Sequence, residues 1–350
     1  MRVLTDLRLQ DFRCFDLLEI SLEPGRTFVM GANAQGKTSI LEAVCLLLRL
    51  QSPRTITTAE AIRFGRPRFS LNAHFSGIHL VFHYSHEGRE LLLDSKPQTH
   101  TDDYLDVGRV AWFANTDLDL VRGGGSVRRR YLDFAGMQCV PGYRKSLRSY
   151  EKALRSRNAL LKDNRPRREI EAFDPPLVEA AEFLFAARAR LCEELAPIAR
   201  TACLEISGGS DSVKISYRAG GGSPFAATLA GSRQEETRLR QTVVGPHRDD
   251  LGIAINGREA AGFASEGQHR GLALSLKLAQ ARHLEAVQNR APILLIDDIF
   301  GELDPDRRNR LLASLPPQSQ TIITTTFLDW AEHKPSDTVF KLAGGRLASL

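Results

Sequence analysis

The chain has 350 residues, of which 42% are apolar, enough for one large domain or two ordinary ones with buried cores. Its five cysteines are widely spaced and include no CxxC pair, which argues against a disulfide framework or a zinc site and favours a reducing compartment. No apolar run reaches the roughly 18 residues of a membrane span, and the start of the chain lacks a signal-peptide core. We therefore expect a cytoplasmic protein without a membrane partner.

The net charge of +5 is unevenly distributed along the chain. Between Arg122 and Arg168 there are 14 lysines and arginines but only 3 acidic residues, an excess of 11 positive charges that leaves the remainder at −6. Such an asymmetric block indicates a surface for a polyanion such as nucleic acid. A set of solvated helix faces would give the same composition, and charge alone does not separate these two interpretations.

The first third of the sequence predicts mainly strands. Alternating or short continuous apolar runs place them over 3–9, 18–22, 27–30, 69–93 (a meander) and 109–113. A glycine-bounded loop after the third of these leads into an apolar helix over 38–50. Helical spacing then predominates from 126 to 206, with a strong helix start at Asp174, Pro175 and Pro176.

The last third returns to alternating helices and strands. A flexible turn at 220–222 closes a small strand region. Helices are then expected over 266–288 and 305–315, and strands over 293–296 and 321–325, followed by two short strands. The simplest architecture is α/β: a nucleotide-binding lobe built from both ends of the chain, with a mainly helical, basic lobe inserted between them. We set the segments at 1–115, 116–210 and 211–350, the last completing the nucleotide-binding lobe.

Residues 31–38 read GANAQGKT, which matches the phosphate-loop pattern GxxxxGK[ST]. Glycines at 31 and 36 permit a backbone that turns its amide groups inward, Lys37 places a positive charge against the β and γ phosphates, and the Thr38 hydroxyl can ligate Mg²⁺. The helix that follows directs its N-terminus at the same anion. The predicted ATP-binding residues are Gly31, Ala32, Asn33, Ala34, Gln35, Gly36, Lys37, Thr38 and Ser39. The alternative is a glycine-rich turn without a ligand.

Residues 293–298 read ILLIDD, an apolar strand that ends in two carboxylates. Asp297 is placed to hold Mg²⁺ together with Thr38, and Asp298 is placed to orient or deprotonate the attacking water. Adjacent acidic residues after a buried strand can also cap a helix or form a turn, and the phosphate loop upstream makes the metal site the better interpretation.

Two further segments indicate which kind of phosphate-loop protein this is. Residues 265–268 read SEGQ and open a long helix, a second anion site at a helix N-terminus, although a simple helix cap would have the same sequence. GELDPDRR follows the acidic strand at 301–308. The order of phosphate loop, Ser-x-Gly-Gln helix, Asp-Asp strand and Glu-Leu-Asp is more specific than any one of these motifs.

This order resembles that of the ABC ATPases, and within them the SMC-like DNA repair group, of which Asn33 in the phosphate loop is typical. The chain is most similar to the RecF family of bacterial recombinational repair. The resemblance rests on six segments spread over nearly the whole chain: LQDFRCF (9–15), GANAQGKTSILEA (31–43), RRRYLD (128–133), GPHRDD (245–250), SEGQHR (265–270) and LLIDDIFGELD (294–304).

The resemblance implies an ABC-type ATPase head with an inserted helical lobe and no long coiled coil. RecF-like proteins dimerise on ATP, bind DNA at gaps and at double-strand to single-strand junctions, and act with RecO and RecR in loading RecA. By analogy Ser265 would contact the γ-phosphate bound to the other subunit, with Gln268 also at the nucleotide, and Asp304 would lie near the dimer seam. We take Lys37, Asp298 and Ser265 as the catalytic residues.

The basic block supplies the candidate DNA contacts. They are Arg128, Arg129, Arg130, Arg144, Lys145 and Arg148. The first three, in the RRRYLD segment, have a structural role or a contact with a protein partner as their alternative.

The sequence departs from typical ABC proteins at two positions. The switch histidine is not visible after 321–326, where a threonine takes its place, and no glutamine stands near Asn115 in the expected Q-loop. Asp298 replaces the glutamate that is common in transporters, which suggests slow hydrolysis.

Other functional classes are weaker alternatives. A transporter-type ABC ATPase that energises a non-DNA partner would share the nucleotide motifs. A metal-dependent nuclease could use His247, Asp249 and Asp250. The sequence lacks the Asn-Lys-x-Asp motif of GTPases, and the His-Arg-Asp at 247–249 lacks the asparagine, lysine and Asp-Phe-Gly of a protein kinase.

Overall fold

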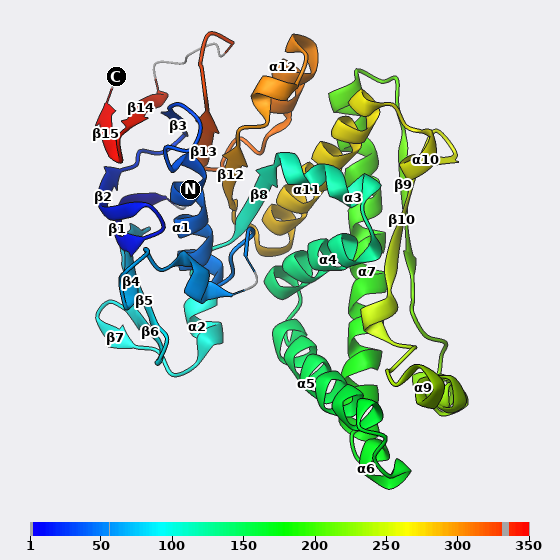
Figure 1. Cartoon of the computed structure of the whole chain (residues 1–350). Coiled ribbons are helices and arrows are strands. Elements are labelled where there is room, and N and C mark those ends of the chain that lie inside the picture. Colours follow the sequence, from blue (N-terminus) through cyan, green and yellow to red (C-terminus); the bar gives the residue numbers. More distant parts are fainter. Residues whose placement is uncertain (1–2, 56, 331–335, 350) are drawn as a thin grey trace. The chain divides into compact units, whose positions relative to one another are not determined.

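Segments from both ends of the chain combine into one unit, and the middle of the chain forms another (Figure 1). The computed structural model describes residues 3–55, 57–330 and 336–349. Unit 1 comprises Met1–Asp117 and Gln280–Leu350, and unit 2 comprises Leu118–Ala279. The expected α/β class, with a helical insertion between two parts of one lobe, is confirmed. Within the described ranges no helix exceeds the 34 residues of α7, and none is both long and apolar enough to cross a bilayer.

The first sheet of unit 1 has a parallel core. Its strand order is β15-β14-β3-β13-β12-β8, and only β14 and β15 pair antiparallel. Nearly continuous buried runs such as ILLID suit a sheet that is covered on both faces. The strands are β3 (Arg26–Met30), β8 (Val110–Ala114), β12 (Ile293–Asp297), β13 (Thr321–Thr325), β14 (Thr338–Ala343) and β15 (Arg346–Ser349).

The second sheet of unit 1 is antiparallel, in the order β2-β1-β4-β5-β6-β7. Alternating burial in β1 and β4 gives it one core-facing side. Its strands are β1 (Leu4–Phe12), β2 (Phe15–Ser21), β4 (Arg68–Phe75), β5 (Ile78–Ser85), β6 (Gly88–Leu93) and β7 (Lys96–Pro97). The predicted meander over 69–93 is therefore correct.

Helix α1 (Lys37–Arg49) packs against β8, β12 and β13 of the parallel sheet and against β1, β4 and β5 of the antiparallel sheet. Every residue of α1 except Thr38 is buried. The smaller helices of unit 1 are η1 (Thr58–Ala61), α2 (Thr101–Leu105), η4 (Phe300–Glu302) and α12 (Pro305–Ser314).

Three polar groups compensate the one carboxylate that α1 buries. Glu42 is fully buried and accepts a bidentate bond from Arg13, at 2.9 and 2.6 Å, a bond from the Ser52 hydroxyl at 2.6 Å and one from Arg54 at 3.1 Å. A buried charge persists only when it is paired in this way. The cluster fixes the β1–β2 turn, which carries Arg13, against α1.

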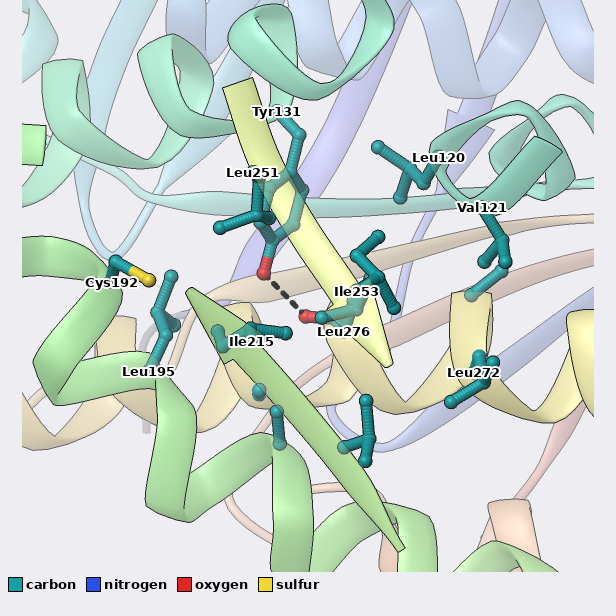
Figure 2. Packing of buried hydrophobic residues seen from close by; sticks show 14 of the residues in the cluster. Leu120, Val121, Tyr131, Cys192, Leu195, Ile215, Leu251, Ile253, Leu272 and Leu276 are labelled. Carbon is teal, nitrogen blue, oxygen red and sulfur yellow. Dashed lines mark hydrogen bonds between the residues drawn. The ribbon is translucent and has the colours of Figure 1, made fainter. Parts of the chain in front are cut away.

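Unit 2 consists of helices packed on a three-stranded antiparallel sheet, β11-β10-β9. Inward-facing residues of β9 and β10 form one core with α4, α7 and the first turns of α11 (Figure 2). Figure 2 also shows the Tyr131 hydroxyl donating a 2.8 Å bond to the carbonyl of Leu276 inside this core.

The larger elements of unit 2 are α4 (Gly125–Cys139), α5 (Tyr143–Lys162), α7 (Asp174–Ser207), β9 (Val213–Arg218), β10 (Asp250–Ile255), β11 (Arg258–Glu259) and α11 (Glu266–Gln288), whose end belongs to unit 1. The shorter ones are α3 (Asp119–Arg122), α6 (Arg167–Glu171), α8 (Phe225–Gly231), α9 (Arg233–Leu239), η3 (Pro246–Arg248) and α10 (Ala260–Phe263). The short helix η2 (Asn115–Leu118) belongs to unit 1 except for its last residue.

The compact units divide the chain at a different place from the segments set on the sequence. Residues 211–279, which we grouped with the ATPase lobe, lie in unit 2. The physical reason is that Val213, Ile215, Leu251 and Ile253 bury their side chains in the same core as α4 and α7. The sequence indicated a small strand region before the turn at 220–222 but neither β10 nor the surface on which these strands pack.

A buried ionic network joins the helices of unit 2 to the GPHRDD segment. Arg188, 2% exposed, donates to Asp249 and Asp133, each at 2.7 Å, to the Pro246 carbonyl at 2.7 Å and to the Tyr143 hydroxyl at 2.9 Å. Asp249 also accepts from the Tyr217 hydroxyl and from a backbone amide. Because each buried charge has several partners, the network fixes the backbone of residues 245–250.

His247 belongs to the same region and is held in its neutral form. Its two ring nitrogens lie 2.6 Å from the Tyr150 hydroxyl and 3.0 Å from the Thr242 carbonyl. A carbonyl only accepts, so the nitrogen facing Thr242 carries the proton and the other accepts from Tyr150. Burial lowers the pKa of His247 to about 4, helped by the positive charges of Arg248, Arg129 and Arg188.

We predict that unit 2 loses stability in acid through His247. Between about pH 6.5 and pH 4 the unfolded chain binds a proton at this histidine that the folded chain does not, so stability falls as the pH falls. The expected loss between pH 7 and pH 5 is on the order of 2 kcal/mol. Urea unfolding followed by circular dichroism at both pH values should show this loss in the wild type and not in His247→Gln. An equal loss in both proteins would contradict the assignment.

Candidate functional site

The carboxyl ends of four parallel strands of unit 1 meet at one edge of the sheet. Their register pairs Asp297 at the end of β12 with Thr324 of β13 and with Ala114 of β8, and pairs Thr325 with Met30, the residue before the phosphate loop. In open α/β sheets ligands bind at this edge. The motifs that are more than 250 residues apart in sequence, GANAQGKT and ILLIDD, are thereby neighbours in space.

Asp297 and Thr38 lie in direct contact. The Thr38 hydroxyl donates to one carboxylate oxygen of Asp297 at 2.8 Å, and the Thr324 hydroxyl donates to the same oxygen, also at 2.8 Å. A hydroxyl and a carboxylate at this separation are hard oxygen ligands, which suit Mg²⁺ held directly or through water. Thr324 was not predicted from the sequence. Only its position opposite Asp297 in the neighbouring strand reveals this contact.

The phosphate loop has the shape that its glycines allow. Gly36 has φ +100°, and a Cβ there would lie 2.6 Å from the sulfur of Cys14. A Cβ at Gly31 would lie 2.5 Å from the carbonyl oxygen of Leu342. Ala32, Asn33 and Ala34 are exposed at the tip of the loop. Both glycines are therefore required sterically by the fold itself.

Two side chains in and after the loop have specific partners. Lys37 is buried and donates to the carbonyls of Gly31 and Ala32 at 2.6 and 3.0 Å. Burial lowers the pKa of Lys37, opposed by the charges of Asp298 and Asp297. The Gln35 side chain accepts a bond from the amide of Gly344 in the β14–β15 turn at 2.8 Å. Ser39 is buried in the first turn of α1.

Asp298 follows Asp297 in a left-handed conformation, φ 50°, which turns its side chain away from the strand direction. Its backbone amide donates to Thr324 at 3.2 Å, its carbonyl accepts from the Asn115 side chain at 3.3 Å, and its carboxylate accepts from the backbone amide of Thr326. Burial raises the pKa of Asp298, against the positive charge of Lys37. Asn115 and Thr326, which lie in the two regions where the expected Q-loop glutamine and switch histidine are missing, thus both contact Asp298.

Ser265 and Gln268 lie in unit 2 and form a reciprocal cap at the start of α11. The backbone amide of Gln268 donates to the Ser265 hydroxyl at 3.3 Å, and the side-chain oxygen of Gln268 accepts from the backbone amide of Ser265 at 2.9 Å. The Gln268 side chain also donates to Asp211 at 2.8 Å. Ser265 is exposed at the N-terminus of a 23-residue helix. Asp304, in unit 1, caps α12 by accepting from the amide of Arg307 at 2.9 Å.

The six candidate DNA contacts have different environments. Arg128 is 14% exposed and makes a bidentate ion pair with Asp250, at 2.6 and 3.0 Å, and Arg129 donates to the Asp249 carbonyl at 2.7 Å. Arg130, Lys145 and Arg148 are exposed, and Arg144 is half-buried. The contacts of Arg128 and Arg129 therefore fit a structural role better than a surface free to bind DNA.

The carboxylates proposed for a nuclease are occupied by internal partners. Asp249 is fully buried against Arg188 and Tyr217, and Asp250 is paired with Arg128. In the described part of the chain, no three histidine, cysteine, aspartate or glutamate side chains gather to hold a metal ion. The GPHRDD segment thus acts as part of the unit 2 framework.

Comparison with known proteins adds to this geometry. Residues 6–110 match a family model described as an AAA domain. The chain is 38% identical to the DNA replication and repair protein RecF of Anaeromyxobacter sp. (strain Fw109-5), with 99% of each chain covered. It is 33% identical to the protein of the same name from Streptococcus pneumoniae (strain ATCC 700669 / Spain 23F-1), with 98% of each covered.

Solved structures show the same fold. A chain described as the recombination mediator protein RecF bound to ATP in the RecFOR pathway superimposes with a TM-score of 0.90 at 28% identity, covering 100% of this chain and 98% of the other. The Smc head domain of Pyrococcus yayanosii, with a coiled coil and joint, gives a TM-score of 0.58 at 13% identity and covers 100% and 97%. At that identity the second likeness concerns the fold alone.

We predict that Thr324 supports the candidate metal corner, which is formed by Thr38 and Asp297. Thr324→Val keeps the shape of the side chain but removes the hydroxyl that orients Asp297, and loss of such an outer partner weakens metal-dependent binding about 10-fold or more. Calorimetric titration with ATPγS at several Mg²⁺ concentrations should show a raised Mg²⁺ requirement. Thr321→Val, at the opposite end of the same strand, is the matched control. Wild-type Mg²⁺ dependence in Thr324→Val would contradict the prediction.

Proposed function

Because this chain belongs to the RecF family of DNA replication and repair proteins, we propose that it is an ATP-dependent DNA-binding protein of recombinational repair. Its ligand is ATP, with Mg²⁺ held by Thr38 and Asp297. It binds gapped or junction-bearing double-stranded DNA as a dimer, and with RecR and RecO it helps RecA to load on single-stranded DNA. The cytoplasm, where DNA and the nucleotide pool of a bacterium are found, is its place of action.

One observation carries the proposal: the edge of the parallel sheet gathers a phosphate loop, a metal corner and a second carboxylate in unit 1. Lys37, Thr38, Asp297 and Asp298 provide a charge for the phosphates, a hydroxyl and carboxylate for the metal, and a group that can orient water. We propose that unit 1 is the ATPase lobe and that these residues, with the loop Gly31 to Ser39, form its nucleotide site.

A second copy of the chain would complete the binding site for the γ-phosphate. Ser265 is exposed at the N-terminus of α11, where backbone amides and the helix dipole favour an anion. In the proposal Ser265 and Gln268 of one subunit meet the nucleotide held by the other, so that ATP links two subunits and hydrolysis separates them. Binding the γ-phosphate would then compete with the reciprocal Ser265–Gln268 cap.

Hydrolysis would be slow, and the protein would act mainly as a switch. Burial raises the pKa of Asp298, and an aspartate reaches less far toward an attacking water than the glutamate of transporters does. Because hydrolysis separates the subunits in this proposal, slow hydrolysis would keep the dimer on DNA for a long time.

The surface we propose for DNA is one face of α5. Of the exposed basic residues there, Lys145, Arg148, Lys152, Arg155 and Lys162 recur at helical spacing. Tyr143, Tyr150 and Arg157 on the opposite face are buried. A stripe of this kind contacts successive phosphates without reading bases, so affinity should depend steeply on salt and weakly on sequence. Arg130 and Arg144 remain candidate contacts beside it, whereas Arg128 and Arg129 serve the framework.

Dimerisation is the first test of the proposal. Sedimentation of the wild type should show a dimer with ATP and Mg²⁺ and a smaller species without ATP. Lys37→Met should not respond to ATP, since it lacks the charge that holds the phosphates. Ser265→Arg should still bind ATP, measured by calorimetry, but should not pair. A Lys37→Met protein that dimerises on ATP would contradict the role of nucleotide, and normal pairing of Ser265→Arg would contradict the contact in trans.

The second test concerns the α5 face. The triple change Lys145→Gln, Arg148→Gln and Lys152→Gln should weaken binding to a gapped duplex and lower the slope of log affinity against log salt by about 2 to 3. Binding is measured by fluorescence anisotropy with ATPγS present. The matched control, which removes three exposed charges elsewhere in unit 2, is Arg200→Gln, Arg238→Gln and Arg240→Gln. Equal losses in both triple variants would show that only net charge matters.

A transporter-type ATPase that acts on a non-DNA partner is the second candidate, because it would share the nucleotide site. The basic face of α5 favours DNA over it. Stimulation of hydrolysis by gapped DNA would separate the two, since DNA leaves such an enzyme unaffected.

A further inference from the structure

Trp330 lies where three parts of the nucleotide site converge, all of them within unit 1. The indole ring stacks on Phe300, with 4.7 Å between ring centroids and 26° between planes, and makes an edge contact with Phe28 at 6.3 Å. The Arg308 guanidinium lies over the same indole, 5.1 Å from its centroid. Phe28 is in β3, directly before the phosphate loop, and Phe300 begins the segment after the two carboxylates.

On one side, the aromatic cluster is connected to Asp298 through Thr326 and the turn that follows it. Thr326, directly after β13, donates its backbone amide to the Asp298 carboxylate. The turn that follows closes on the Phe327 carbonyl, which accepts from the Thr325 hydroxyl and from the Trp330 indole nitrogen, each at 2.8 Å. A shift of Thr326 toward or away from Asp298 would therefore move the indole through a short, hydrogen-bonded turn.

On the other side, the cluster contacts the segment that reads GELD at 301–304 through Phe300 and Arg308. Arg308 in α12 donates to the carbonyls of Phe300 and Leu303, at 3.1 and 2.9 Å, and so holds both ends of the η4 turn. Phe300 is fully buried and lies four residues before Asp304, the N-cap residue of α12. The indole packs on both the ring of Phe300 and the guanidinium of Arg308, so it contacts the two groups that fix this segment.

We propose that Trp330 is a positioning residue that couples the state of Asp298 to the conformation of residues 300–304. It transmits the position of the Thr326–Asp298 contact to the segment that, under the proposed function, meets the second subunit. Aromatic stacking and a cation over the indole give this contact a preferred geometry, which a merely apolar residue lacks. Coupling of this kind changes the dimerisation equilibrium without changing the intrinsic affinity for ATP.

The first experiment observes the indole directly. The chain has two tryptophans, so Trp112→Phe leaves Trp330 as the only one. Adding ATPγS with Mg²⁺ should change the emission of Trp330 in this protein, and should leave it unchanged in the Lys37→Met, Trp112→Phe double variant. No emission change in a protein that calorimetry shows to be saturated with nucleotide would overturn the proposal.

The second experiment separates coupling from stability. Trp330→Ala should bind ATPγS with an affinity within about twofold of wild type but should raise the dissociation constant of the ATP-linked dimer about tenfold. Trp330→Phe, which keeps a stacked ring on Phe300, should restore most of the dimer. A Trp330→Ala protein that dimerises normally, or one whose ATP affinity falls as much as its dimerisation with no rescue by phenylalanine, would overturn the proposal.

A wild type that binds ATPγS yet does not dimerise would contradict the proposed function. The emission of Trp330 would still decide whether the indole follows the nucleotide site.

Discussion

The register of four parallel strands is the constraint on which the site depends. Neighbouring strands lie about 4.8 Å apart, so side chains that follow them at the same level are brought within reach of one another. Here that level holds Asp297, and hydroxyls from two directions, Thr38 and Thr324, donate to one of its oxygens. A slip of one residue in β12 would turn Asp297 to the other face of the sheet and place a hydrophobic side chain beside Thr38 and Thr324.

The register is useful only because the phosphate loop cannot move independently of the sheet. Helix α1 is buried between two sheets, and Glu42 within it is tied to the β1–β2 turn through Arg13. Close contacts at Gly31 and Gly36 leave no space for a larger residue even without a ligand. The loop is thus organised before nucleotide arrives, which lowers the ordering cost of binding.

Unit 2 uses its charges in two ways. Arg157 and Arg188 pair with buried carboxylates, where removing one partner would leave an unpaired charge in the interior, and Arg128 pairs with the partly buried Asp250. The basic residues on the exposed face of α5 have no such role in holding the core. The amino-acid composition does not distinguish the paired arginines from the exposed basic residues of α5. The excess of positive charge therefore overstates the surface available to a polyanion. Of the three arginines at 128–130, Arg128 and Arg129 belong to the framework of unit 2.

The sequence alone determined the α/β class, the phosphate loop, the two carboxylates and the family resemblance, because each depends on local spacing or on the order of motifs along the chain. The tertiary structure decided what local pattern does not carry. It paired Thr324 with Asp297, brought Asn115 and Thr326 to Asp298, and placed β9 and β10 in unit 2, since strand register and buried packing join residues that are distant in sequence. It also decided which arginines are buried, because burial depends on the partner that faces a side chain and not on the residue type.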